Sequence, residues 1–210
     1  KLYEKIQAAR AGAEKFVLDY GADSEVTPAR PPLPVDGRVD ALLLSHSHLD
    51  HCGSVPLLAA KKNGTDVYAH PCARDLTNLM LLDSVKINLQ EIGDIEEAKI
   101  PFNKDDVKNS IKRFLGVKYR KPFKLHSAEV TYFNAGHIPG SAMILIKTHG
   151  KSLLYTGNHN TIDTRLLHGC DMKLPKIDYL ITESTYAEKE HPDREEEEKK
   201  LVEFINETVA

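Results

Sequence analysis

The sequence has few of the features that mark membrane, secreted or strongly basic proteins. No apolar run approaches the ~18 residues that a membrane span needs, and the first ten residues lack the apolar centre of a signal peptide. The 3 cysteines, Cys52, Cys72 and Cys170, show no CxxC pairing, which predicts small buried thiols rather than a disulfide framework. The formal net charge of −3 gives no global basic signature, so nucleic-acid binding would have to rest on a local patch. We therefore expect a cytoplasmic protein without a membrane segment.

The remaining composition is that of a globular chain. At 210 residues and 41% hydrophobic positions it can bury one core of ordinary size. Hydrophobic periodicity predicts helices and strands that alternate in the first half, followed by a run of strands and a closing helix. The expected helices cover 2–13, 54–62, 73–92, 106–115 and 191–209, and the expected strands cover 15–21, 39–48, 65–70, 128–136, 141–148, 151–157 and 178–184. The helix over 73–92 should bury a stripe through Leu76, Leu79, Met80 and Val85.

Histidine and aspartate gather directly behind one buried strand, in the motif "HSHLDH" at residues 46–51. His46 and His48 lie two apart in an extended chain, so they project the same way and can share one ion. Asp50 and His51 follow where the chain turns into the next helix, where they can address a second ion nearby. Imidazole and carboxylate ligands suit Zn²⁺ and also accept Mn²⁺ or Fe²⁺. Without an ion, each unsatisfied buried polar group would cost about 1–3 kcal/mol, so the motif predicts a metal site.

A second stretch, "KRFLGVKYRKPFKL" at residues 112–125, interleaves basic and aromatic side chains. It is open to two interpretations. Lys112, Arg113, Arg120 and Lys121 could form a phosphate-contacting surface beside rings that stack on bases. Alternatively, this is an ordinary solvated helix and strand whose aromatic rings belong to the core.

Three further motifs follow in order: "AGHIPGSAMI" at 135–144, "LLYTGN" at 153–158 and "ITESTYAEKEHPDRE" at 181–195. Together with "HSHLDH" they resemble the metallo-β-lactamase superfamily, and within it the β-CASP nucleases, the branch that contains cleavage and polyadenylation specificity factors and ribonuclease J. The resemblance implies an α/β fold, an incomplete αββα sandwich, over residues 1–190. It also implies that a helix over 191–210 leads into a β-CASP cassette, which lies beyond the end of this chain.

The resemblance also implies a two-zinc site and the residues that form it. Asn158 stands where the family has a carboxylate that bridges both metals, and a neutral carboxamide is a poor bridge. Glu183 matches an acidic residue that orients a catalytic histidine beyond Ala210. His159 is an additional candidate ligand. The implied metal ligands are His46, His48, Asp50, His51, His137 and Asn158, and the implied catalytic residues are Asp50 and Glu183.

By this resemblance the chain is a metal-dependent hydrolase of single-stranded RNA, of the 3′-end processing or decay type, acting as an endonuclease and also in the 5′-to-3′ exonuclease direction. We expect weak turnover because of Asn158 and the absent cassette. One alternative is a non-catalytic RNA-binding subunit or engineered fragment that keeps the fold. Another is a small-molecule hydrolase of the same superfamily, such as a thioesterase. The last helix has an apolar face formed by Leu201, Phe204, Ile205 and Thr208, which predicts a homodimer.

Overall fold

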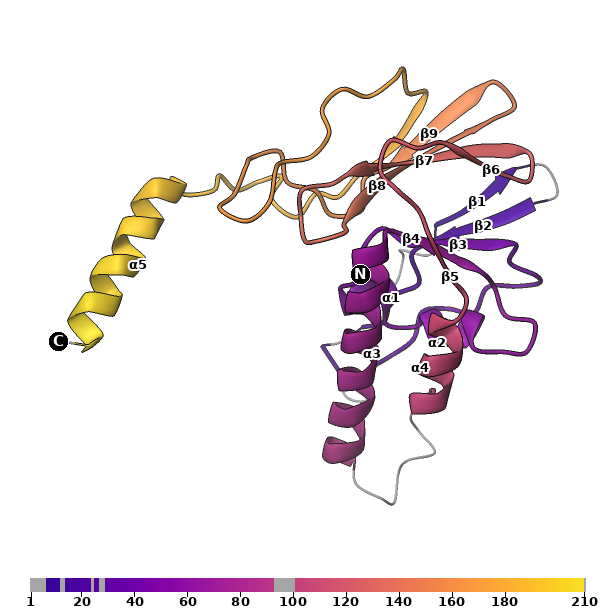
Figure 1. The fold of residues 1–210 in the computed structure, drawn as a ribbon, viewed down its shortest axis with the longest axis horizontal. Coiled ribbons are helices and arrows are strands. Elements are labelled where there is room, and N and C mark those ends of the chain that lie inside the picture. The colour runs from indigo at the N-terminus through magenta and orange to yellow at the C-terminus, as the bar shows by residue number, and fades with distance from the viewer. Residues whose placement is uncertain (1–6, 12–13, 24, 27–28, 93–100, 210) are drawn as a thin grey trace.

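Two five-stranded sheets lie face to face at the centre of the protein (Figure 1). The computed structural model describes residues 7–11, 14–23, 25–26, 29–92 and 101–209. The first sheet has the order β1-β2-β3-β4-β5 and is parallel except between β1 and β2. The second has the order β10-β9-β8-β7-β6 and is antiparallel except between β10 and β9. The strands are β1 (Gln7–Ala11), β2 (Glu14–Leu18), β3 (Ala41–Leu43), β4 (Val67–Ala69), β5 (Phe114–Gly116), β6 (Phe123–Leu125), β7 (Ala128–Asn134), β8 (Ala142–Thr148), β9 (Lys151–Tyr155) and β10 (Tyr179–Ile181).

The main hydrophobic core fills the space between the sheets. Phe16 and Leu43 of the first sheet belong to one buried cluster with Tyr132 and Ile144 of the second. Because side chains alternate along a strand, Ile144 faces this core while its neighbour Leu145 faces the opposite side of the second sheet. Both sides of β8 are buried, which explains its continuous apolar sequence.

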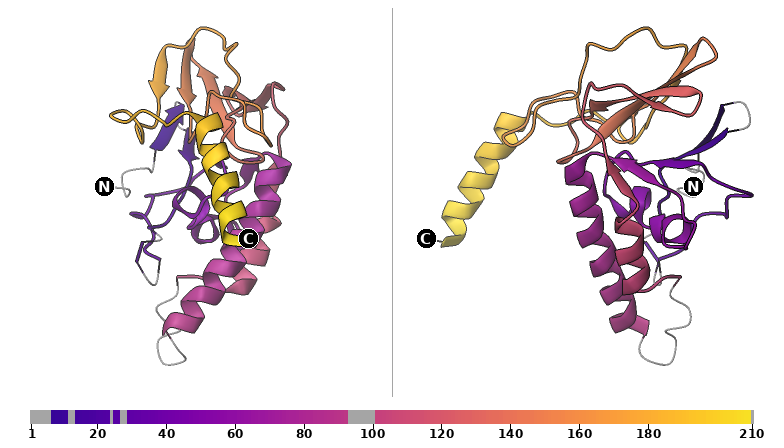
Figure 2. Two further views of the ribbon diagram at one scale, coloured as in Figure 1. Left: turned by 90° about the vertical axis from the view of Figure 1, so that its left-hand side faces the viewer. Right: turned by 45° about the vertical axis from the view of Figure 1, so that its right-hand side comes forward.

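Helices cover the outer face of the first sheet (Figures 1 and 2). Val55 of α2 and Ala73 of α3 pack there against Val17 and Leu42. The outer face of the second sheet is covered instead by Cys170, Leu174 and Ile177 from an irregular segment. The predicted α/β sandwich is thus confirmed, with its described helical layer on one side. The helices are α1 (Leu49–Cys52), α2 (Val55–Ala59), α3 (Pro71–Ile92), α4 (Lys104–Ile111) and α5 (Arg194–Val209).

The N-terminal helix predicted over residues 2–13 is wrong where the structure describes it. Gln7–Ala11 form β1, which pairs with β2 so that Ala9 lies opposite Phe16. Leu2 and Ile6, which also carried the helical pattern, lie outside the described residues. Helix propensity is a weak preference, and backbone pairing with a neighbouring strand overrides it.

The apolar stripe predicted for the long helix is only partly right. Val85 is buried in α3 as expected, but Leu79 is 63% exposed. Gly140 lies close to the first turn of α3, where a β-carbon on the glycine would be 2.6 Å from the Ala73 nitrogen. The buried line of α3 is formed by Ala73, Thr77, Leu81 and Val85.

The prediction for the cysteines is only partly right. Cys52 and Cys170 are buried free thiols, but Cys72 is exposed because it lies in the first turn of α3, outside the buried line. The helix predicted over 106–115 begins and ends earlier, at Lys104 and Ile111, because Asn103 caps its start and β5 begins at Phe114.

Among the described residues no helix combines the length and the apolar character that crossing a membrane requires.

Candidate metal centre

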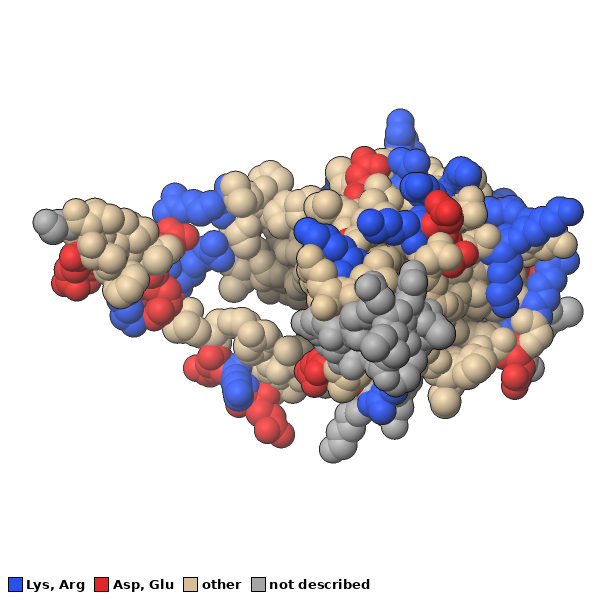
Figure 3. Space-filling model, turned by 90° about the horizontal axis from the view of Figure 1, so that it is seen from below, with Lys and Arg blue, Asp and Glu red and all other residues tan. Residues whose placement is uncertain are grey.

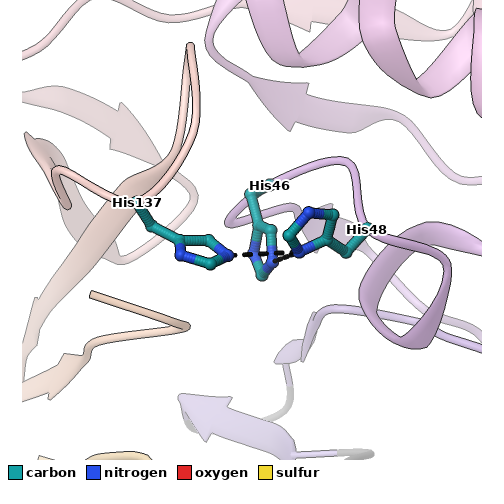
Figure 4. Close-up of side chains that lie close together, drawn as sticks. All are labelled: His46, His48 and His137. Atoms are coloured by element: carbon teal, nitrogen blue, oxygen red, sulfur yellow. Dashed lines mark hydrogen bonds between the residues drawn. The ribbon is translucent and has the colours of Figure 1, made fainter. Parts of the chain in front are cut away.

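Three histidine rings converge where β3 ends (Figure 4). His46 and His48 follow β3 directly, and His137 follows β7 of the other sheet. His48 Nδ1 lies 3.2 Å from His46 Nε2 and 3.1 Å from His137 Nε2. Tetrahedral zinc with Zn–N bonds of ~2.0–2.1 Å separates its ligand nitrogens by about 3.4 Å. The three rings therefore already stand close to the spacing that a bound cation requires.

The protonation state of these rings also suits a metal. Burial lowers the pKa of His48, although the nearby Asp50 carboxylate acts in the opposite direction. Burial lowers the pKa of His137 as well, and the neighbouring His48 adds to that effect. Both rings are therefore neutral at pH 7 and keep a nitrogen lone pair available, which is the form that binds metal.

A buried carboxylate, Asp19, lies beneath the histidines at the end of β2. Its Oδ2 accepts hydrogen bonds from Ser45 Oγ at 2.6 Å and from Tyr155 OH at 2.7 Å. The same oxygen lies 2.6 Å from His51 Nδ1, and Oδ1 accepts a 2.6 Å bond from the Ser45 backbone N–H. Asp19 thus holds His51, and together with His46 and His51 it forms a second described group whose potential ligand atoms lie within 4.8 Å of one another.

This pairing orients the His51 ring. Burial alone would lower the pKa of His51, but the charge and hydrogen bond of Asp19, together with Asp50, outweigh it and raise that pKa to about 9. Since Nδ1 faces Asp19, Nε2 points to the other side of the ring, 3.3 Å from Asp50 Oδ2. Nε2 is buried and, within the described residues, has no hydrogen-bond partner. A pKa of about 9 keeps this ring protonated at pH 7, so a second cation between Nε2 and Asp50 would have to displace the Nε2 proton.

The turn after β9 approaches the same site. Gly157 has a φ of +54°, and a β-carbon there would lie 2.7 Å from Ser45 Oγ, next to His46. This contact carries the half-buried Asn158 to the neighbourhood of the histidines. Neither Asn158 nor His159 belongs to the described groups whose ligand atoms already lie close together.

Glu183 has its partners within this chain. Its Oε1 accepts a 2.9 Å hydrogen bond from the His159 backbone N–H and lies 3.6 Å from His159 Nδ1. Burial would raise the pKa of Glu183, but hydrogen bonds from Thr185 and from His159 outweigh it, so that pKa is lowered and the carboxylate stays ionised. Glu183 thus fixes the turn that carries Asn158.

The aromatic rings of the basic stretch are largely packed. Phe114 is buried and Phe123 stacks on Tyr68, which supports the core interpretation for these rings. Arg113 donates to the Lys62 carbonyl, and Arg120 binds Asp171. Lys112 and Lys121 are exposed. Figure 3 shows basic side chains gathered along the right-hand and upper margins of the body, well beyond a single stretch.

Sequence reasoning missed Asp19. The stretch "KFVLDYG" was interpreted only as a strand that ends at a glycine. The available signal was a charged residue directly after three buried apolar positions, Phe16 to Leu18, where an unpaired carboxylate would be costly. Its partner His51 lies 32 residues away, so the sequence alone could not supply it.

Two stacked sheets, with a histidine cluster where strands of both sheets end, define an α/β protein with a candidate metal site. A family model described as "Metallo-beta-lactamase superfamily domain" matches residues 12–185, and the chain belongs to that superfamily. This confirms the resemblance that the motifs carry.

Individual relatives support the nuclease branch. The chain is 41% identical over 201 residues to "Probable RNase MJ4" of Methanocaldococcus jannaschii, covering 93% of this chain and 45% of that protein. It is 31% identical over 197 residues to "RNase aCSPSF2" of Saccharolobus solfataricus, covering 92% and 38%. It is 35% identical over 173 residues to "Cleavage and polyadenylation specificity factor subunit 3" of Dictyostelium discoideum, covering 81% and 22%. The chain spans less than half the length of these relatives.

Proposed function

We propose that this chain is the metal-binding part of a metal-dependent hydrolase of RNA phosphodiester bonds. The observation that carries the proposal is the convergence of His46, His48 and His137 from both sheets, close to zinc-ligand spacing. The names of the relatives support RNA as the substrate rather than a thioester. Cleavage within single-stranded RNA, with 5′-to-3′ exonuclease action in addition, belongs to the same proposal.

Each residue of the centre has a proposed task. His46, His48 and His137 hold one cation, and Asp50 with His51 Nε2 offers a second position. Zinc bound there would supply Lewis-acid polarisation of a phosphoryl oxygen and neutralise charge in the transition state. Asp19 keeps the His51 ring oriented. Further support for the second position would come from the turn of Asn158 and His159, which is fixed by Glu183.

The domain division is also a proposal. Residues 1–190 form the catalytic sandwich, and 191–210 form a separate helical extension. In support, α5 stands away from the two sheets (Figures 1 and 2), and within its described residues no side chain is buried. An ion pair between Arg165 and Glu198 links it to the body.

The main competing function is RNA binding without catalysis. Asn158 favours it, because a neutral carboxamide at the bridging position would leave two close dications without a negative ligand between them. Asn158→Asp is expected to raise the zinc content from about one to about two ions per chain, since a carboxylate adds charge where the second ion binds. Zinc per chain is measured by plasma mass spectrometry, and hydrolysis by cleavage of an end-labelled single-stranded RNA.

A matched control is Asn160→Asp, which adds the same charge two residues away. Two ions and new hydrolysis with Asn158→Asp alone would support a weakened nuclease. Two ions with RNA bound but uncut would favour the binding subunit.

We also infer that α5 pairs with a second copy of the chain. Leu201, Phe204 and Ile205 are 58%, 66% and 49% exposed, and their i, i+3, i+4 spacing is that of a helix-pairing seam. Phe204→Glu is expected to convert a dimer to a monomer in light scattering at high concentration. Glu203→Gln, on a different side of the helix, serves as the control. A monomeric unmodified chain would contradict the inference.

A further inference from the structure

A cavity of about 1060 Å³ lies beside the candidate metal centre rather than within it. Its wall includes Ile138 and Gly140, from the loop that begins with His137. The opposite wall is the irregular segment 166–173, and Tyr119 and Arg120 close one side. The groove therefore begins one residue from a proposed metal ligand.

Cationic groups stand along this groove. Arg120 is held by Asp171, whose carboxylate is buried and accepts a 3.1 Å bond from Arg120 Nε. This bond fixes the guanidinium at the rim, where its side chain remains 71% exposed. Lys173 is exposed on the segment 166–173. Because Asp171 is already paired with Arg120, Lys173 leaves the groove with cationic character that suits phosphate groups.

Two apolar side chains of the same groove are largely exposed to solvent. Leu166 is 93% exposed and Met172 is 72% exposed, both on the segment that forms one wall. These flexible apolar side chains lie between cationic groups. They suit a ligand in which flat apolar faces alternate with phosphates. An unpaired nucleotide strand has this form, because its bases are exposed. A base-paired duplex would hide those faces.

The groove wall is connected to His137 by hydrogen bonds. Asp171 Oδ2, which binds Arg120, also accepts a 3.0 Å bond from the Asn134 N–H. Asn134 Oδ1 in turn accepts from the Gly136 N–H at 3.0 Å, directly before His137. A strand in the groove would therefore lie against the scaffold that positions the metal ligand.

We propose that this groove binds the nucleotides of single-stranded RNA that adjoin the cleavage point, with Lys173 and Arg120 as phosphate contacts. The inference rests on the proposed function and adds a path for the substrate. It also assigns Arg120, rather than Lys112 or Arg113, as the contact from the basic stretch.

The test is fluorescence anisotropy of a fluorescein-labelled 12-nucleotide oligouridine bound to the full chain in EDTA, over a range of salt concentrations. Lys173→Ala is expected to weaken binding severalfold and to lower the slope of log affinity against log salt by about 0.7, the value for one lost single-strand phosphate contact. Lys173→Glu should weaken it further. Lys86→Ala, an exposed lysine of α3 outside the groove, should leave affinity and slope unchanged. In parallel, ultraviolet crosslinking of a 4-thiouridine RNA should label the peptide that contains residues 166–173.

The outcomes separate the two proposals. If the unmodified chain binds the oligomer and both Lys173 variants match it, or crosslinks fall elsewhere, the groove is wrong while the RNA function stands. Equal or tighter binding of a duplex of the same length would overturn the single-strand assignment. If the unmodified chain binds no RNA, the proposed function fails together with the groove.

Discussion

Replacing His137 with alanine is expected to abolish tight zinc binding. His137 is the ligand that the second sheet contributes to the cluster, and its Nε2 lies 3.1 Å from His48 Nδ1. Without it, the first cation would keep only the two rings that follow β3. Changes to groups that merely orient metal ligands cost about 10–100-fold in affinity, so the loss of a ligand itself should cost more than about 100-fold. Zinc per chain after dialysis, followed by titration against a chromophoric chelator, measures the effect.

The matched control is His149→Asn. His149 is an exposed histidine in the turn between β8 and β9, with a φ of +48° that asparagine tolerates. It should leave zinc content unchanged. Equal zinc content in His137→Ala and the unmodified chain would remove the three-histidine centre from consideration.

Replacing Asp19 with asparagine is expected to give the largest loss of stability of any single substitution at the site. The carboxylate is buried and faces Ser45, His51 and Tyr155 at 2.6–2.7 Å. Removing one partner of a buried charged pair costs about 3–5 kcal/mol, because the other partner keeps its desolvation cost. Urea unfolding of the chain in EDTA measures this difference without a contribution from bound metal.

The same substitution should change the pH dependence of unfolding. The folded-state pKa of His51 is raised from its ordinary 6.5 to about 9, so the pair stabilises the metal-free fold fully below pH 6.5. That stabilisation is lost as pH rises through about 9. The stability difference between the unmodified chain and Asp19→Asn should therefore be largest near pH 6 and shrink toward pH 9.5.

Tyr155→Phe is the matched control for Asp19→Asn. It removes one hydrogen bond to the same charged oxygen and keeps the carboxylate paired with His51. The expected cost is about 1.5–3 kcal/mol, with little change between pH 6 and 9.5. If both variants lost the same stability with the same pH profile, the Asp19–His51 pair would not be the stabilising contact.

Much of the fold was predictable because its signals are local. Continuous apolar runs identified β3 and β8, and the reason is that both faces of these strands are buried. The failures were non-local. Leu2, Ile6, Ala9 and Ala13 have helical spacing, yet pairing with β2 makes Gln7–Ala11 a strand. The buried face of α3 is the one that packs against other elements, with Val85 beside Val107 of α4, and the apolar spacing within the helix does not contain that information.

The metal centre also has one part that the sequence predicts and another that only the tertiary structure shows. The sequence by itself determined that His46, His48, Asp50 and His51 come close together, because they lie within six positions behind one buried strand; the structure places the first two in the loop after β3 and the last two in α1. Only the tertiary structure decided that His137 meets them, 89 residues from His48, and that Asp19 holds His51. The packing of two sheets sets these contacts, since it brings together strand ends that are remote in the chain.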